Sequence, residues 1–257
     1  MTANALILEK TADQLGVYVY ATRKDMGNAA GKNVAESLKR LLAAQDQVCV
    51  AFAAAPSQNE FLAALSSAAG IDWSRVVVFH LDEYIGLPEN APQRFSNYLN
   101  EHIYSLVPIG TIHYINASAV DAQAECDRYS ALLAANPLDI ACIGIGENGH
   151  LAFNDPPVAD FKDPKVVKPV ELDSRCRQQQ VNDGCFKQIE DVPTHALTMT
   201  IPAIMAAKEV HCIVPGPTKV DAVKGTIYGE ISTKCPASIL RTHANARLYV
   251  DKDAMGI

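Results

Sequence analysis

The sequence lacks the features that mark membrane, nucleic-acid-binding or secreted proteins. Its 257 residues carry 22 basic and 29 acidic side chains, a formal charge of −7. This balance offers no broad basic surface, so we expect no nucleic acid and no anionic membrane as partner. No apolar run is long enough to cross a bilayer. Residues 1–10 show no cleavage-site pattern, and we expect no signal peptide.

Paired cysteines and paired histidines are also missing. The seven cysteines are scattered and contain no Cys-x-x-Cys pair, which is typical of reduced thiols in a cytoplasmic protein. Among the seven histidines, no two stand at the spacing of a metal site, so no metal is predicted. A Gly-x-Ser-x-Gly elbow is absent, which leaves serine hydrolysis without a nucleophile.

Short runs of valine and isoleucine alternate with longer stretches of helical periodicity. We predict strands over residues 17–20, 48–53, 75–81, 140–145, 210–214 and 247–250. Val34, Leu38 and Leu41 mark one helix face, and Cys126 and Tyr129 indicate another. This order predicts an α/β fold: a doubly wound, mostly parallel sheet with helices on both faces, in a single domain over residues 1–257.

Residues 156–191 differ from the rest of the chain. They contain four prolines, many charges and the run Gln178-Gln179-Gln180, without a clear apolar period. We interpret this segment as a functional loop or lid, with a surface excursion of no function as the alternative.

A first candidate site follows the strand predicted at 75–81, in Leu81-Asp82-Glu83-Tyr84. Adjacent carboxylates point in different directions, so at most one faces a common ligand. Asp82, partly desolvated at a strand end, could act as a general base. The alternative is that Asp82 caps the following turn.

A second candidate site is the glycine-rich stretch from Gly144 to Asp155, which contains Glu147-Asn148-Gly149-His150. Its glycines allow positive φ and close backbone approach, and His150 can exchange protons near neutral pH. Asp155 could bond the second ring nitrogen and fix the tautomer. A histidine with a merely structural hydrogen bond is the alternative.

The same glycines match Gly-x-Gly-x-x-Gly, the pattern of a dinucleotide site. The match follows a late strand, and Pro156 and Pro157 crowd the helix that it should open. The pattern is therefore weak evidence for a nucleotide, and no cofactor is predicted.

Three further residues could hold an anion. Ser57 opens Ser-x-x-Glu, a capping box that would begin a helix after a strand. Lys219 stands in the first turn of a predicted helix, where its charge opposes the helix dipole unless an anion binds. Arg175 lies in the predicted lid and could close over the same anion. A solvated surface charge is the alternative for each cation.

The two motifs Leu81-Asp82-Glu83-Tyr84-Ile85-Gly86-Leu87 and Gly144 to Asp155, in this order and separation, resemble the glucosamine-6-phosphate deaminase family. Weaker similarity runs from about Arg23 to Val250. The resemblance implies a Rossmann-like fold and a cofactor-free conversion of a small-molecule sugar phosphate, glucosamine 6-phosphate, with water to fructose 6-phosphate and ammonia. It implies that Asp82 moves the C2 proton to C1 and that His150 opens the sugar ring.

The chain departs from the family pattern in three places. Asn148 stands where the family often has an acid and Asp155 where it often has glutamate, which predicts a modified balance of ring opening. The turn 53–57 lacks the Thr-Gly-Gly-Thr of the family, although Ser57, Arg175 and Lys219 correspond to phosphate-contacting positions. Pro156-Pro157 replaces a serine pair, so we expect no activation by the N-acetylated sugar phosphate.

Related activities remain as alternatives. The 6-phosphogluconolactonases resemble this family, but their histidine motif typically continues Thr-Ala-Ser-Leu-Phe-Pro, whereas this one continues Leu151-Ala152-Phe153-Asn154-Asp155. Two further alternatives are a galactosamine-6-phosphate deaminase and a sensor that binds a sugar phosphate without converting it. The sequence leaves the substrate epimer and the oligomeric state open, a homo-oligomer included.

Overall fold

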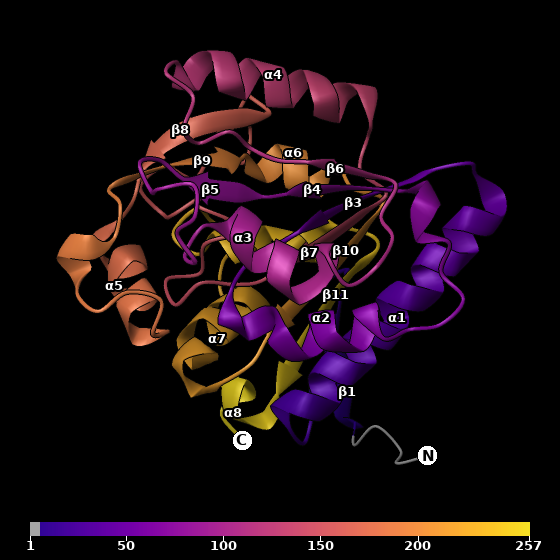
Figure 1. The fold of residues 1–257 in the computed structure, drawn as a ribbon. Coiled ribbons are helices and arrows are strands. Elements are labelled where there is room, and N and C mark those ends of the chain that lie inside the picture. Colours follow the sequence, from indigo (N-terminus) through magenta and orange to yellow (C-terminus); the bar gives the residue numbers. More distant parts are fainter. Residues whose placement is uncertain (1–5) are drawn as a thin grey trace.

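A central sheet of eight strands forms the middle of the molecule, in the order β1-β2-β11-β10-β7-β3-β4-β6 (Figure 1). The computed structural model describes residues 6–257. All neighbouring strands in this sheet run parallel except β1 and β2. The strands are β1 (Leu6–Ala12), β2 (Leu15–Tyr20), β3 (Val48–Phe52), β4 (Val76–His80), β6 (Thr111–His113), β7 (Ile140–Ile143), β10 (Glu209–Val214) and β11 (Ala246–Asp251).

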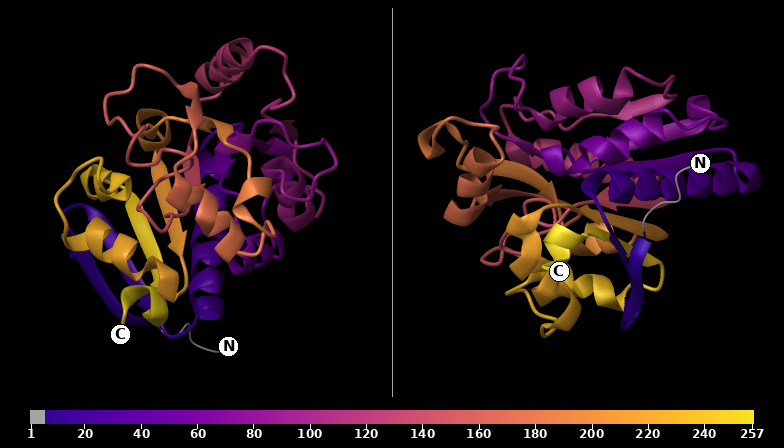
Figure 2. Two further views of the ribbon diagram at one scale, coloured as in Figure 1. Left: turned by 90° about the vertical axis from the view of Figure 1, so that its left-hand side faces the viewer. Right: turned by 90° about the horizontal axis from the view of Figure 1, so that it is seen from below.

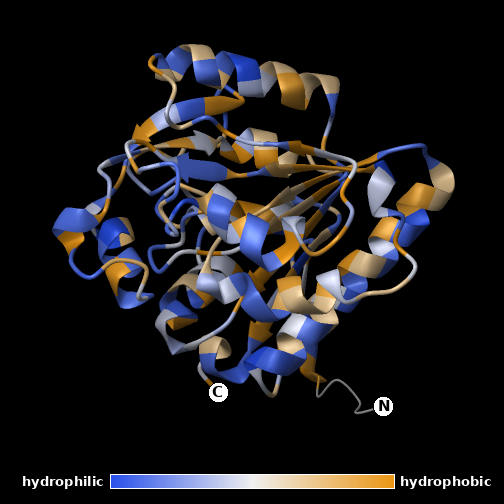
Figure 3. Ribbon diagram, viewed as in Figure 1, coloured by the Kyte–Doolittle hydropathy of each residue, from blue (hydrophilic) through white to orange (hydrophobic). Residues whose placement is uncertain are grey.

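Both faces of the sheet are covered, which explains the near-continuous apolar runs. In β3, Val48, Val50 and Phe52 pack into the cluster on one face, whereas Cys49 and Ala51 pack into the cluster on the other. The first face is covered by α1 (Arg23–Ala44), α2 (Asn59–Ser66), α3 (Phe95–Leu99) and the π-helical turn Asn100–Tyr104. The second is covered by α4 (Ala122–Ala135), α6 (Ile201–Met205), α7 (Val220–Tyr228) and α8 (Lys252–Met255). Figure 3 shows hydrophobic strands between helices with hydrophilic outer faces.

Glycines in α1 fix the position of α2. A Cβ atom added at Gly27 would lie 2.4 Å from Glu60 Cβ, and one added at Gly31 would lie 2.7 Å from Ala64 Cβ. The two helices therefore pack more closely than larger residues would permit. The Arg23 side chain also forms an ion pair with Glu60 at 2.7 Å. These contacts hold the start of α2 beside the end of β3.

A second, antiparallel sheet has the order β5-β9-β8 and lies against the end of the first. Its strands are β5 (Asp82–Tyr84), β8 (Val167–Glu171) and β9 (His195–Met199), and α5 (Ser174–Asn182) follows β8. The right-hand view of Figure 2 shows α5 projecting beyond the central sheet, and in the left-hand view α5 lies in front of it. The segment 156–191 thus contains a strand and a helix, and it packs on a hydrophobic cluster that includes Tyr84, Phe153 and Cys176. The segment therefore contributes to a buried cluster, although its sequence shows no clear apolar period.

The predicted fold class is confirmed: one domain with a mostly parallel sheet and helices on both faces. The six predicted strands correspond to β2, β3, β4, β7, β10 and β11. No helix among residues 6–257 is both long and apolar enough to span a membrane. The expectation about a signal peptide concerned residues 1–10, of which residues 1–5 lie outside the described residues.

Candidate active site

One cavity lies at the carboxyl ends of the central strands β3, β4, β7 and β10, where doubly wound sheets bind ligands. Its volume is about 500 Å³, including the space at its open mouth. Asp82, His150, Ser57 and Lys219 all line it. Four of the residues predicted from separate motifs therefore face one space.

Asp82 enters the cavity from the first position of β5. It pairs with Thr198 of β9, and its side chain is buried, with 7% of the residue exposed. Burial raises the pKa of the Asp82 carboxyl well above its ordinary value, and the negative charges of Glu83 and Asp155 raise this pKa further. Such a carboxyl is more basic than an ordinary aspartate, as a general base near neutral pH must be.

Glu83 points away from this cavity and closes the start of α3. Its carboxylate accepts hydrogen bonds from the backbone N–H groups of Phe95 and Ser96, at 3.0 and 2.9 Å, and from the Ser96 hydroxyl at 2.8 Å. The prediction that only one of the two carboxylates faces the ligand is consistent with this geometry. Glu83 therefore caps α3, which is not the turn that Asp82 would cap in the alternative interpretation.

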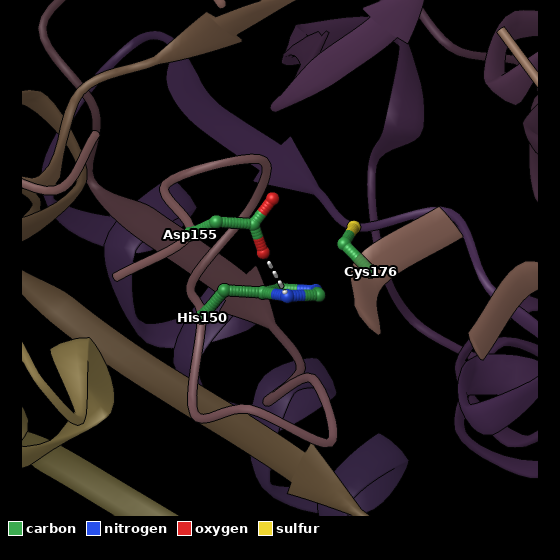
Figure 4. A group of neighbouring side chains, drawn as sticks. All are labelled: His150, Asp155 and Cys176. Atoms are coloured by element: carbon green, nitrogen blue, oxygen red, sulfur yellow. Dashed lines mark ion pairs between the residues drawn. The ribbon is translucent and has the colours of Figure 1, made fainter. Parts of the chain in front are cut away.

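His150 and Asp155 lie side by side in the loop that follows β7. The ring nitrogen Nδ1 is 2.8 Å from Asp155 Oδ1, and both side chains are buried. The approach is an ion-pair contact without a directed hydrogen bond, because the carboxylate oxygen lies off the plane of the ring, which Figure 4 shows edge-on. Burial acts to raise the pKa of the Asp155 carboxyl, but His150 and Asn148 outweigh it, and the net pKa is lowered.

Asn148 supports this pair through Asp155 and not through the imidazole ring. Its side-chain NH₂ donates to Asp155 Oδ1 at 2.9 Å, while its oxygen accepts from the backbone N–H of His150 at 3.1 Å. The backbone N–H of Asp173 also donates to Asp155 Oδ2, at 3.3 Å. Position 148, where the family often has an acid, holds a neutral amide in this chain, so Asp155 is the carboxylate beside the imidazole ring.

The backbone around His150 needs both small residues and an unusual conformation. A Cβ atom at Gly146 would lie 2.1 Å from the His150 ring, so this glycine makes room for the imidazole. Gly149 has φ +85°, which favours glycine. Ala152, which lines the cavity, has φ +49°, a strained value for a residue with a side chain. No helix begins at residues 151–155, contrary to what a dinucleotide site requires.

Lys219 is the cation of the cavity. It is 5% exposed, and its ammonium forms no ion pair or hydrogen bond with residues 6–257. Burial lowers the pKa of this ammonium, whereas the more distant charges of Asp183 and Glu147 act to raise it. An unpaired ammonium on a largely buried side chain is costly, and an anionic ligand would compensate for that cost. The alternative of a solvated surface charge was wrong for Lys219.

The start of α2 also faces the cavity, but without the predicted capping box. Neither the 3₁₀ turn Pro56–Gln58 nor α2 has a side-chain cap. The Ser57 hydroxyl instead accepts from the Gln58 side chain at 2.9 Å, and Glu60 is bound to Arg23. The prediction failed because a partner on α1 competes for Glu60. The turn presents Ser57 to the cavity nonetheless.

Arg175 is the one predicted binding residue that the structure does not bring to the cavity. It stands at the exposed start of α5, whose buried face carries Cys176, Gln179 and Gln180. Gln179 and Gln180 line the cavity in its place, and the Gln179 side-chain oxygen accepts from the backbone N–H of Glu147 at 2.8 Å. The phosphate contact of Arg175 stays a prediction that requires α5 to move.

Three glutamines of the cavity, Gln58, Gln179 and Gln180, were not among the predicted site residues. Gln58 is 1% exposed, and its side-chain oxygen has no hydrogen-bond partner in residues 6–257. The run at 178–180 was noticed only as a break in periodicity. These glutamines can be recognised as site residues only because they are buried, and burial cannot be read from the sequence.

A family model, "Glucosamine-6-phosphate isomerases/6-phosphogluconolactonase", matches residues 21–250. The chain belongs to this family. A family member named glucosamine-6-phosphate deaminase, from Bacillus cereus (strain B4264), is 40% identical over 187 residues, which are 73% of this chain and 70% of the relative.

Two solved structures extend the comparison within the family. A monomeric glucosamine-6-phosphate deaminase superposes with a TM-score of 0.84 at 27% identity, over 93% of this chain and 98% of the other. A 6-phosphogluconolactonase from Thermotoga maritima superposes with a TM-score of 0.75 at 19% identity, over 93% of this chain and the whole of the other. The second likeness concerns the fold alone.

Proposed function

We propose that this protein is an enzyme of amino-sugar catabolism that converts glucosamine 6-phosphate and water to fructose 6-phosphate and ammonia. The observation that carries the proposal is that Asp82, His150 and Lys219 line one cavity. An aldose-to-ketose shift on a phosphorylated sugar needs a carboxylate base, a separate proton shuttle and a cation for the phosphate. The name of the 40% identical relative supports the same substrate.

In this proposal Asp82 is the base of the isomerisation. Its carboxylate takes the proton from C2 of the open-chain sugar, the C2–H electron pair forms a C1–C2 double bond, and the C1 carbonyl pair moves to O1, which takes a proton from solvent. The proton held by Asp82 then returns at C1, and the nitrogen electron pair forms a protonated imine at C2. Water adds to this imine, and ammonia departs. The raised pKa of Asp82 suits both halves of the step, because the group must accept the proton and then release it.

His150 opens the pyranose ring before Asp82 acts. The imidazole takes the proton of the anomeric hydroxyl and delivers a proton to the ring oxygen, so it passes through a charged form. Asp155, 2.8 Å from Nδ1, stabilises that imidazolium. Asn148 holds the Asp155 carboxylate in place through its side-chain NH₂.

The phosphate binds at the end of the cavity that holds Lys219. The ammonium, buried and unpaired within the described chain, supplies the charge. The Ser57 hydroxyl and the uncapped start of α2 supply hydrogen-bond donors. The segment 156–191 acts as a lid, and Gln179 joins it to the loop of His150 through the backbone of Glu147. The unpaired cysteines of the described chain favour a cytoplasmic location.

Ammonia release from glucosamine 6-phosphate by the purified protein tests the proposal. Wild type should release ammonia, and Asp82→Asn should lose most of the rate while it still binds fructose 6-phosphate. Asp127→Asn is the matched control, because Asp127 is exposed on α4 and does not line the cavity. If neither wild type nor Asp82→Asn reacts but both bind the sugar phosphate, the protein is a sensor. Lactone hydrolysis without ammonia release would favour the 6-phosphogluconolactonase alternative. A faster rate on galactosamine 6-phosphate than on glucosamine 6-phosphate would identify the galactosamine epimer as the substrate.

A further inference from the structure

Three side chains of different donor types meet beside the cavity. The ring nitrogen of His150, a carboxylate oxygen of Asp155 and the sulfur of Cys176 all lie within 4.8 Å of one another, and all three residues are buried (Figure 4). His150 and Asp155 come from the loop after β7, and Cys176 comes from α5. Because these residues are far apart in sequence, their spacing did not indicate a shared site.

A second observation points to a missing ligand at the same place. Nδ1 of His150 is buried and has no hydrogen-bond partner of acceptable geometry in residues 6–257. Buried nitrogen atoms of this kind are usually bonded. The carboxylate beside the ring lies off its plane in Figure 4, so neither group satisfies the other fully.

We propose that His150, Asp155 and Cys176 form a binding site for a thiophilic divalent cation of the zinc class. Imidazole, carboxylate and thiolate are the ligands that zinc takes, whereas magnesium and calcium need oxygen ligands. Bonds of about 2.0–2.3 Å hold tetrahedral ligands about 3.3–3.8 Å apart. Small side-chain movements reach that spacing from the present triangle. Water from the cavity that His150 lines would take the fourth position.

Charge and proton balance are consistent with this site. On binding, the Cys176 thiol releases its proton to solvent, and the sulfur, Nδ1 of His150 and a carboxylate oxygen of Asp155 each donate an electron pair to the cation. The cation's two positive charges balance one thiolate and one carboxylate. A buried complex with no net charge avoids the cost of an isolated charge.

Occupation of the site would switch the enzyme off, a consequence that depends on the proposed function. The cation takes the Nδ1 electron pair and the Asp155 charge, so the imidazole can no longer become an imidazolium stabilised by Asp155. It also joins α5 to the loop of His150, which holds the segment 156–191 in place. The cation should therefore inhibit without competing with the substrate phosphate for its binding position, since Lys219 is not a ligand of the cation.

Cobalt titration of the chelator-treated full-length protein tests the site without any assay of turnover. Wild type should bind one cobalt with a sulfur-to-cobalt charge-transfer band in the near ultraviolet and the visible bands of tetrahedral cobalt. Cys176→Ser should lose the sulfur band and bind at least about tenfold more weakly, since even supporting residues of metal sites cost that much. Cys185→Ser, in the same segment, should match wild type. Thermal unfolding of each variant without metal shows that it is folded.

A cobalt spectrum without the sulfur band, or one that Cys176→Ser leaves unchanged, would overturn the inference. The second measurement is the ratio of ammonia release with zinc to release with chelator. This ratio should be low for wild type and Cys185→Ser and near one for Cys176→Ser. If wild type releases no ammonia at all, the proposed function fails, while the cobalt spectrum still decides whether the site exists.

Discussion

Replacing Lys219 by methionine should make the protein more stable and less active at the same time. In the absence of ligand, the Lys219 side chain is largely buried, and its ammonium has no ion pair in the described chain. Methionine keeps the length and apolar contacts of the lysine stem and removes the charge. Relief of an unsatisfied buried polar group is worth about 1–3 kcal/mol, which for a chain of this size corresponds to a rise in Tm of about 2–12 °C.

Catalysis should change in the opposite direction. Without Lys219 the substrate phosphate would enter a desolvated cavity with no counter-charge. Loss of one partner of a buried charge pair costs about 2–4 kcal/mol, or about 30- to 1000-fold in kcat/KM. Most of the loss should fall on KM, because the phosphate is bound equally in the ground and transition states.

The assay combines thermal unfolding with steady-state ammonia release. Lys224→Met is the matched control, since Lys224 is exposed on the same helix, α7. It should change neither Tm nor KM appreciably. Fructose 6-phosphate should raise the Tm of wild type and of the control but not that of Lys219→Met. An unchanged KM in Lys219→Met, or a Tm below that of wild type, would refute the assignment of Lys219 as a phosphate ligand that is unpaired without substrate.

Four further predictions concern Asp82, His150 and the absence of activation. Because the pKa of Asp82 is raised, the acid limb of kcat/KM against pH should lie above the ordinary aspartate range; a limb at that ordinary value would contradict the role as base. Because the pKa of Asp82 is higher in the folded than in the unfolded protein, its contribution to stability is fully present below the unfolded-state pKa and is lost as pH rises through the folded-state pKa. Asp82→Asn, which cannot ionise, should therefore raise Tm at neutral pH. His150→Gln should harm turnover of the closed sugar more than that of an open-chain analogue, and equal losses would exclude ring opening as its function. Rate curves should be hyperbolic, and N-acetylglucosamine 6-phosphate should not activate; a sigmoidal curve abolished by that sugar would show that Pro156-Pro157 does not prevent activation.

The sequence was sufficient for the central sheet because its buried strands are apolar throughout. β3 and β4 are buried at every position, so their residues cannot alternate with polar ones. The second sheet gave no such pattern. In β8 only Val167 and Val170 are buried, three residues apart, and the strand contains Pro169, which argues against a strand. Its position depends on pairing with β9, a contact distant in sequence.

The candidate site was predictable where a motif placed the residue at the end of a strand, and less so elsewhere. Asp82 and His150 follow β4 and β7, whose carboxyl ends meet at one edge of the sheet. The phosphate contact of Arg175 stays a prediction, since its neighbours on α5, and not its own charge, decide which face of that helix is buried. Cys176 was counted among scattered thiols, since only packing of α5 brings it near Asp155.

The short strand β5 makes the choice between Asp82 and Glu83 a matter of register. Antiparallel pairing sets Asp82 opposite Thr198 and Glu83 opposite Leu197. A slip of one residue would exchange the two sides of the strand, bring the longer glutamate into the cavity and leave α3 without its cap. Substitutions around this strand should therefore be easier to accept in evolution than insertions or deletions. Inserting or deleting an odd number of residues would exchange the positions of the base, Asp82, and the helix cap, Glu83.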